Sequence, residues 1–323
     1  MIRSFRALFA ACALFTFSLP AQAWPDKPIR LVVPFAAGGT TDVIARIIAE
    51  RLTTKYGISV VVENVGGAGG NTGAAIVAKA ENDTHIFLMA TPGPAVMNQF
   101  MYARMPYETS SAFAPVAFVA SIPSVLIVKG DAPYKTLRDL VSAAKQNPQT
   151  FNFGSAGNGS TGHLGGSILN VLASVDTRHV PYRGSAPMLQ DVISGNIQFT
   201  IDSLPGIISF IQAGSVRALA VTSDKRASQL PDVPNSTEAG LPDLKVSTWL
   251  ALLAPVATPR NIVTRFNEMV NGVLGDADIS AKLANLGANV EPTLKSPDDL
   301  ARFLAAEQPT WKRMVEAAGA RIE

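Results

Sequence analysis

The stretch Leu31-Val32-Val33-Pro34-Phe35-Ala36-Ala37-Gly38-Gly39-Thr40-Thr41-Asp42 joins an apolar run to a glycine turn and then to a helical pattern. A strand, a flexible turn and a helix start, in this order, direct unpaired backbone N–H groups at a bound anion. The two glycines have no Cβ and let a ligand approach the main chain. An ordinary connection between a strand and a helix has the same pattern, with Thr40, Thr41 or Asp42 as the cap.

Residues 1–23 have the features of a cleaved export signal. Arg3 and Arg6 precede an apolar run that is too short to span a bilayer, and Ala21-Gln22-Ala23 matches a small-x-small cleavage site. We therefore predict an exported mature chain that begins at Trp24. The single cysteine, Cys12, lies inside the signal, so we expect no disulfide, no thiolate metal site and no cysteine nucleophile in the mature chain.

Charge and length narrow the possible functions. The signal contains two of the 27 basic residues and none of the 25 acidic ones, so the mature chain is neutral. A neutral surface does not favour nucleic acid or anionic lipid as a partner. About 300 mature residues indicate two domains.

The pattern along the chain predicts two similar α/β blocks. Strands alternate with helices over residues 29–90 and again over 151–222, which favours parallel sheets. Between the blocks, residues 114–128 form a long β-type run with Pro123, which suits a segment that passes from one domain into the other. Residues 249–254 read as a strand that returns. A final helix should begin at Ser296 and end at Gly319, kinked or divided at Pro309.

Five turns of similar composition follow the predicted strands: 34–42, 91–93, 154–163, 182–185 and 202–203, where a helix is expected to open at Asp202. They supply small residues, hydroxyls and free amides, with few charges. Ligands of α/β proteins bind outside the carboxyl ends of the strands, so these turns suit a small polar anion held by backbone N–H groups.

Other interpretations were weighed at the same turns. Gly66–Gly73 lacks the third glycine of a dinucleotide fingerprint and reads as a turn. Ser155 or Ser160 with His163 would be the parts of a serine hydrolase, although His163 at a helix start also suits capping. Arg183 either faces an anion or is solvated. Asp42 and Asp202 are helix caps or a carboxylate pair, and Asp42 could also hold waters or a ligand amine. The histidines show no metal-ligand spacing, so no metal or cofactor is expected.

The sequence resembles the periplasmic substrate-binding receptors of tripartite tricarboxylate transporters, the Bug family. The resemblance covers the mature chain and is carried by ordered motifs, among them Pro34-Phe35-x-x-Gly38-Gly39-x-x-Asp42, Gly154-Ser155-Ala156-Gly157-Asn158-Gly159-Ser160-Thr161, Val180-Pro181-Tyr182-Arg183-Gly184 and Pro231-Asp232-Val233-Pro234. The chain departs from the family pattern at Ala36-Ala37, at residues 82–85 and at Arg183, where prolines, an acidic-Gly-Tyr turn and lysine are common.

The resemblance implies a non-enzymatic, two-domain periplasmic-binding-protein fold of type II-like architecture, with the ligand cleft between the domains. Domain 1 is expected to comprise residues 24–123 and 224–323, and domain 2 residues 124–223. The expected ligand-binding residues are Phe35, Ala37, Gly38, Gly39, Thr40, Thr41, Asp42, Thr91, Ser155, Ala156, Gly157, Asn158, Ser160, Thr161, His163, Tyr182, Arg183, Asp202 and Ser203.

The function that follows is a monomeric periplasmic receptor. It would bind a small carboxylate, which is a di- or tricarboxylate, an amino acid or an aromatic acid, and deliver it to the membrane subunits of a tripartite tricarboxylate transporter. The alternatives are an exported serine hydrolase and a sensor that presents the same ligand to a signalling partner.

Overall fold

The computed structural model describes residues 24–148 and 150–323, and the predicted export signal lies outside the described residues. The strands are β1 (Ile29–Val33), β2 (Val60–Asn64), β3 (Ile86–Ala90), β4 (Phe113–Lys129), β5 (Asn152–Ser155), β6 (Arg178–Pro181), β7 (Phe199–Ser203), β8 (Val216–Val221) and β9 (Ser247–Pro255). None of the helices in the described part of the chain is both long enough and apolar enough to cross a membrane.

The main helices follow the strands in chain order. They are α1 (Thr40–Tyr56), α2 (Asn71–Ala78), α3 (Asn98–Met101), α4 (Leu137–Gln146), α5 (Thr161–Ala173), α6 (Ser185–Ser194), α7 (Leu204–Gln212), α8 (Arg260–Leu274), α9 (Ala277–Asn285) and α10 (Pro297–Ala318). Two short turns, η1 (Ala68–Gly70) and η2 (Gly93–Met97), follow β2 and β3.

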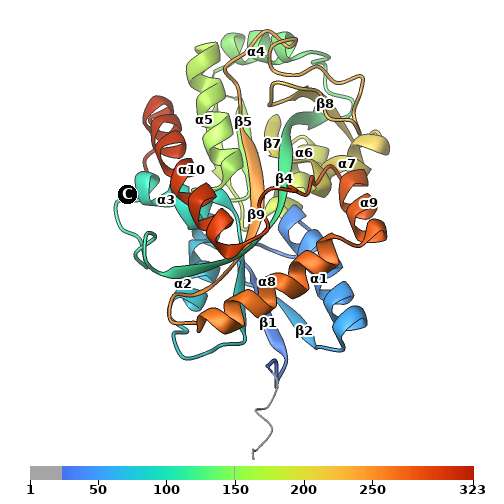
Figure 1. The fold of residues 1–323 in the computed structure, drawn as a ribbon. Coiled ribbons are helices and arrows are strands. Elements are labelled where there is room, and N and C mark those ends of the chain that lie inside the picture. Colours follow the sequence, from blue (N-terminus) through green and yellow to red (C-terminus); the bar gives the residue numbers. More distant parts are fainter. Residues whose placement is uncertain (1–23, 149) are drawn as a thin grey trace, which may run out of the picture.

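The long strand β4 joins two lobes. As far as Pro123 it pairs with β9, and from Ser124 onward it pairs with β7 on one edge and β8 on the other. We call lobe 1 the first part of β4 with β1, β2, β3, β9, α1, α2 and α8. Lobe 2 is the second part of β4 with β5 to β8 and α4 to α7 (Figure 1). The change of partner at Pro123 agrees with the prediction that this segment crosses between domains.

The expectation of parallel sheets is correct only within each α/β block. β1 pairs in parallel with β2 and β3, and β5 pairs in parallel with β6 and β7. The pairs β3–β9, β4–β9, β4–β7 and β4–β8 are antiparallel. The reason is that β4 leaves lobe 1 and β9 returns to it, so the two crossing strands run in opposite directions.

Two smaller expectations are corrected. β7 continues through Asp202 and Ser203 instead of ending before them, so the following helix starts at Leu204. The C-terminal helix has Ser296 as its N-cap and Gly319 as its C-cap, as predicted, but Pro309 lies inside it without dividing it.

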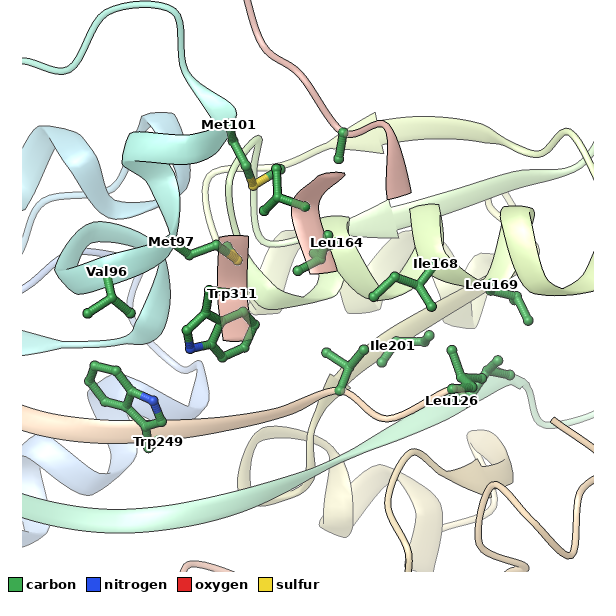
Figure 2. Close-up of a cluster of buried hydrophobic side chains, with 14 of the residues drawn as sticks. Val96, Met97, Met101, Leu126, Leu164, Ile168, Leu169, Ile201, Trp249 and Trp311 are labelled. Carbon is green, nitrogen blue, oxygen red and sulfur yellow. The ribbon is translucent and has the colours of Figure 1, made fainter. Parts of the chain in front are cut away.

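Hydrophobic packing connects the lobes on one side of the sheet. Figure 2 shows Val96 and Met97 of η2 and Met101 of α3 in the same buried cluster as Leu164 and Ile168 of α5. Trp311 of α10 belongs to the same cluster and is 4% exposed. The helix α10 therefore contributes to a core shared by both lobes.

Candidate functional site

A small cleft lies between the lobes, with a volume of about 40 Å³. Lobe 1 contributes residues from the turns after β1 and β3 and from β9, and lobe 2 contributes residues from the turns after β5, β6 and β7. The lining residues are Phe35, Gly39, Thr40, Thr41, Thr91, Ala156, Ser160, Thr161, Gly162, Ser185, Asp202, Ser203, Thr248 and Leu250.

Four helices begin at this cleft. Gly39 precedes α1, Ser160 precedes α5, Gly184 precedes α6, and Ser203 precedes α7. The first N–H groups of a helix have no partner within the helix, and the helix dipole adds partial positive charge at the same end. One helix start from lobe 1 therefore faces three from lobe 2, and together they can surround a small anion with backbone donors.

The cleft lining carries almost no formal charge. Among the described residues that line it there is no lysine, arginine or histidine, and Asp202 is the one acidic residue. Asp202 Oδ1 accepts a hydrogen bond from the Ser203 N–H at 2.8 Å. Burial raises the pKa of Asp202 to about 6, against the opposing effects of the Ser185 hydroxyl and the Ser203 N–H.

The turn after β1 is held by a carboxylate that does not line the cleft. Asp42 accepts hydrogen bonds from the Gly38 N–H at 2.9 Å, from Asn64 Nδ2 at 3.0 Å and from Arg46 Nε at 3.0 Å. Asn64 Nδ2 also donates to the Phe35 carbonyl. Burial alone would raise the pKa of Asp42, but the bonds from Arg46, Gly38 and Asn64 outweigh it and hold the pKa below its usual value. Asp42 thus fixes the shape of the turn that presents Gly39 and Thr40.

The turn after β5 contains a serine and two histidines in close contact. Ser155 Oγ lies 2.7 Å from His179 Nε2 and accepts a hydrogen bond from the Gly157 N–H. The rings of His163 and His179 are stacked with their centres 4.0 Å apart, and His163 Nδ1 accepts from the Gly159 N–H. Burial lowers the pKa of His163 to about 4, and burial together with His163 lowers the pKa of His179 to about 3. Both rings are therefore neutral at neutral pH.

This arrangement differs from a hydrolytic site. Ser155 is 0% exposed and does not line the cleft. Ser160 does line it, but its Oγ accepts from the backbone N–H of His163 as a helix cap and makes no hydrogen bond to the ring in the described structure. A nucleophile needs both access to substrate and a base within reach, and neither serine has both.

Several contacts cross directly between the lobes. The Ala36 N–H donates to the Arg183 carbonyl at 3.1 Å, and the Tyr102 hydroxyl donates to the Asn158 carbonyl at 2.6 Å. Thr40 Oγ1 accepts from the Gly206 N–H at 2.9 Å and donates to the Ser203 carbonyl at 3.3 Å. The structure therefore represents a closed arrangement of the lobes.

Glycines of lobe 1 permit this close approach. A Cβ at Gly66 would lie 2.6 Å from the Arg183 carbonyl oxygen, and a Cβ at Gly93 would lie 2.6 Å from that of Gly159. A Cβ at Gly69 would collide with the Asn158 carbonyl oxygen. The glycine-rich stretch that the spacing argument removed from nucleotide binding thus packs against lobe 2.

The sequence profile described as "Tripartite tricarboxylate transporter family receptor" matches residues 44–320 of this chain. The chain belongs to this receptor family. Protein BugT of Bordetella pertussis is 31% identical to the receptor over 317 residues, which cover 98% of this chain and 97% of BugT.

Solved structures of similar proteins have the same fold as the receptor. Rpa4515 of R. palustris, solved with adipate, is 40% identical, has a TM-score of 0.87, and the match covers 92% of this chain and 98% of that one. MatC (Rpa3494) of Rhodopseudomonas palustris, solved with bound malate, is 32% identical with a TM-score of 0.87, and the match covers 90% of this chain and 100% of that one. These matches confirm the predicted two-domain periplasmic-binding-protein fold.

The receptor brings ten of the expected ligand-binding residues to the cleft lining: Phe35, Gly39, Thr40, Thr41, Thr91, Ala156, Ser160, Thr161, Asp202 and Ser203. The other nine surround it without lining it: Ala37, Gly38, Asp42, Ser155, Gly157, Asn158, His163, Tyr182 and Arg183. Among these, the Tyr182 hydroxyl donates to Asp191, and Arg183 has an exposed side chain.

Four lining residues of the receptor were not among the expected ones. Gly162 and Ser185 follow the glycine turns at the starts of α5 and α6, so the same turn signal could have included them. Thr248 and Leu250 lie on the crossing strand β9. Nothing local in an apolar strand distinguishes the residues that face a cleft from those that face a core.

Proposed function

We propose that this receptor binds a small carboxylate in the cleft between its lobes and delivers it to the membrane subunits of a tripartite tricarboxylate transporter. The observation that carries the proposal is the convergence of four helix starts on a cleft whose described lining has no fixed cation. Backbone N–H groups in such a site are oriented before the ligand arrives, so they bind an anion with little reorganisation.

The similar structures support a carboxylate. Rpa4515 was solved with adipate and MatC with malate, and both of these ligands are dicarboxylates. Both proteins match the receptor over at least nine-tenths of its length. The ligand class remains a small organic acid, because backbone amides and hydroxyls recognise a carboxylate group and not the rest of the molecule.

The proposal includes the location and organisation of the mature protein. Removal of residues 1–23 would release a monomer into the periplasm. Its domain 1 would comprise residues 24–123 and 224–323, and its domain 2 residues 124–223. The switch of β4 pairing between Pro123 and Ser124 supports the first boundary.

The receptor would act by binding and not by catalysis. The buried position of Ser155, the capping role of Ser160 and the neutral histidines support this choice over a serine hydrolase. Closure of the lobes would remove water from around the anion and so strengthen each backbone contact. The ligand stabilises the closed state to the extent that it binds that state more tightly than the open one.

A thermal-shift screen of mono-, di- and tricarboxylates, amino acids and aromatic acids tests the proposal. An acid at 100 times its Kd should stabilise the protein by about 2.7 kcal/mol. This corresponds to a rise in Tm of roughly 5 °C. The matched control is the amide of the same acid, which lacks the negative charge and should give no shift. The proposal fails if no acid raises the Tm, or if a bound acid or its ester is chemically converted.

A further inference from the structure

One carboxylate oxygen in the cleft makes no hydrogen bond. Asp202 is 9% exposed, and its Oδ2 is buried without a hydrogen-bond partner among the described residues. Its other oxygen, Oδ1, is fixed by the Ser203 N–H. A buried acceptor without a donor is costly, and native proteins rarely leave one unless something else satisfies it.

The neighbouring elements offer no cation to Asp202. His163 on α5, Asp191 on α6 and Lys129 at the end of β4 are the ionisable residues of the described elements packed on β7, and none of them lines the cleft. The helix α7, which follows Asp202 directly, has no ionisable residue. Burial of the charge raises the pKa of Asp202 to about 6, so the group is mostly a carboxylate at neutral pH.

A second carboxylate entering this cleft would be repelled unless a hydrogen atom separates the two groups. The cleft is small, about 40 Å³, so the helix starts and Asp202 act on the same end of a ligand. A hydroxyl or an ammonium group on the carbon next to the ligand carboxylate can supply this hydrogen. Asp42 cannot accept such a donor in the cleft, because its oxygens are already used by Gly38, Arg46 and Asn64.

We propose that Asp202 selects 2-hydroxy and 2-amino carboxylates, because its unpartnered oxygen accepts a hydrogen bond from the donor beside the ligand carboxyl group. This inference rests on the proposed function and adds the class of acid to it. The helix starts would bind the carboxylate of any acid, and Asp202 would distinguish acids that carry the donor from those that do not.

The test compares matched acids on the wild-type protein by titration calorimetry at pH 7.5. The sets are succinate with malate and aspartate, adipate with 2-aminoadipate, and phenylacetate with mandelate. Within the set that binds, we expect the acid with the donor to bind roughly tenfold or more tightly than its parent, because a parent leaves a buried acceptor unpaired. This comparison requires no variant to fold.

The variant Asp202→Asn then tests the residue itself. Its amide oxygen can still accept from the Ser203 N–H, while its NH2 group replaces the acceptor with a donor. We expect about a tenfold or larger loss for the hydroxy or amino acid and no loss for the parent. The control is Asp131→Asn, which makes the same change at a side chain that is 75% exposed, and it should bind like wild type.

The outcomes separate the two proposals. If parent and donor-bearing acids bind equally well, and Asp202→Asn changes neither, this inference is wrong while the carboxylate function stands. If the parent acid binds more tightly as the pH falls through 6 in wild type but not in Asp202→Asn, a proton on Asp202 supplies the hydrogen, and donor selection is also wrong. If no acid in any set binds, the proposed function fails and this inference fails with it.

Discussion

The substitution Gly66→Ala should hold the lobes apart without disturbing either one. The backbone of Gly66 is not in the left-handed region, and the new Cβ would lie 2.6 Å from the Arg183 carbonyl oxygen of lobe 2. Relief of this contact requires a separation of about 0.7 Å, since non-bonded carbon atoms prefer distances near 3.5 Å. The Ala36 N–H now donates to the same oxygen at 3.1 Å and would lose that hydrogen bond.

The expected cost falls on the closed state. A lost hydrogen bond costs about 1 kcal/mol, and overpacking adds about 1 to 3 kcal/mol. A total of about 2 kcal/mol would weaken ligand binding roughly 30-fold. In an open arrangement Gly66 and Arg183 are not in contact, so the stability of the unliganded protein should change little.

Titration calorimetry with the best acid of the screen measures the affinity, and thermal unfolding without ligand measures the stability. Gly275→Ala is the matched control, because Gly275 lies at the end of α8 and its new Cβ would meet only backbone oxygens of the same helix. An unchanged Kd in Gly66→Ala would refute the reasoning that this contact belongs to the ligand-bound state. A large loss of Tm without ligand would show that the contact belongs to the fold instead of closure.

Three further predictions concern single side chains. The pKa of Asp202 is raised from 3.8 to about 6, so the folded state binds its proton more tightly than the unfolded state and loses stability as the pH rises from about 4 to above 6. The full effect is about 3 kcal/mol; in thermal unfolding, Asp202→Asn should therefore have a higher Tm than wild type at pH 7.5 and an equal one near pH 4, and a constant difference would contradict this sign. Asp42→Asn removes the charge that holds Arg46, so calorimetry should show about tenfold weaker binding through a looser turn, and wild-type affinity would mean that the turn keeps its shape without the ion pair. Ser155→Ala removes the partner of His179 and should lower stability by about 1 kcal/mol in urea unfolding while ester hydrolysis stays at the background rate; hydrolysis that disappears in this variant would support the hydrolase alternative.

Much of the secondary structure was predictable because the signals are local. β3 and β6 have the predicted bounds, and the caps Ser296 and Gly319 define the last helix as expected. The end of β7 was misplaced because Asp202 and Ser203 resemble a capping pair, whereas their backbone continues the pairing with β4. Tertiary pairing outweighed the local preference there.

The candidate site was predictable as a set of turns but not as a set of side chains. Each turn shows its glycines and hydroxyls in the sequence, and ten of the expected residues do line the cleft. The direction of each side chain depends on its neighbours in space. Arg183, for example, appears suited to an anion, yet its side chain is exposed and its carbonyl is the group in contact with lobe 1.

The sequence alone determined that strands end in amide-rich turns at helix starts, since strand formation, glycine turns and helix capping depend on residues a few positions apart. Only the tertiary structure decided which of these turns meet, because contacts such as that of Thr40 with Ser203 and Gly206 join residues more than 160 positions apart. It also distinguished the two aspartates. Asn64 and Arg46 satisfy Asp42, while the position of Asp202 at the end of β7 leaves one buried oxygen available to a ligand.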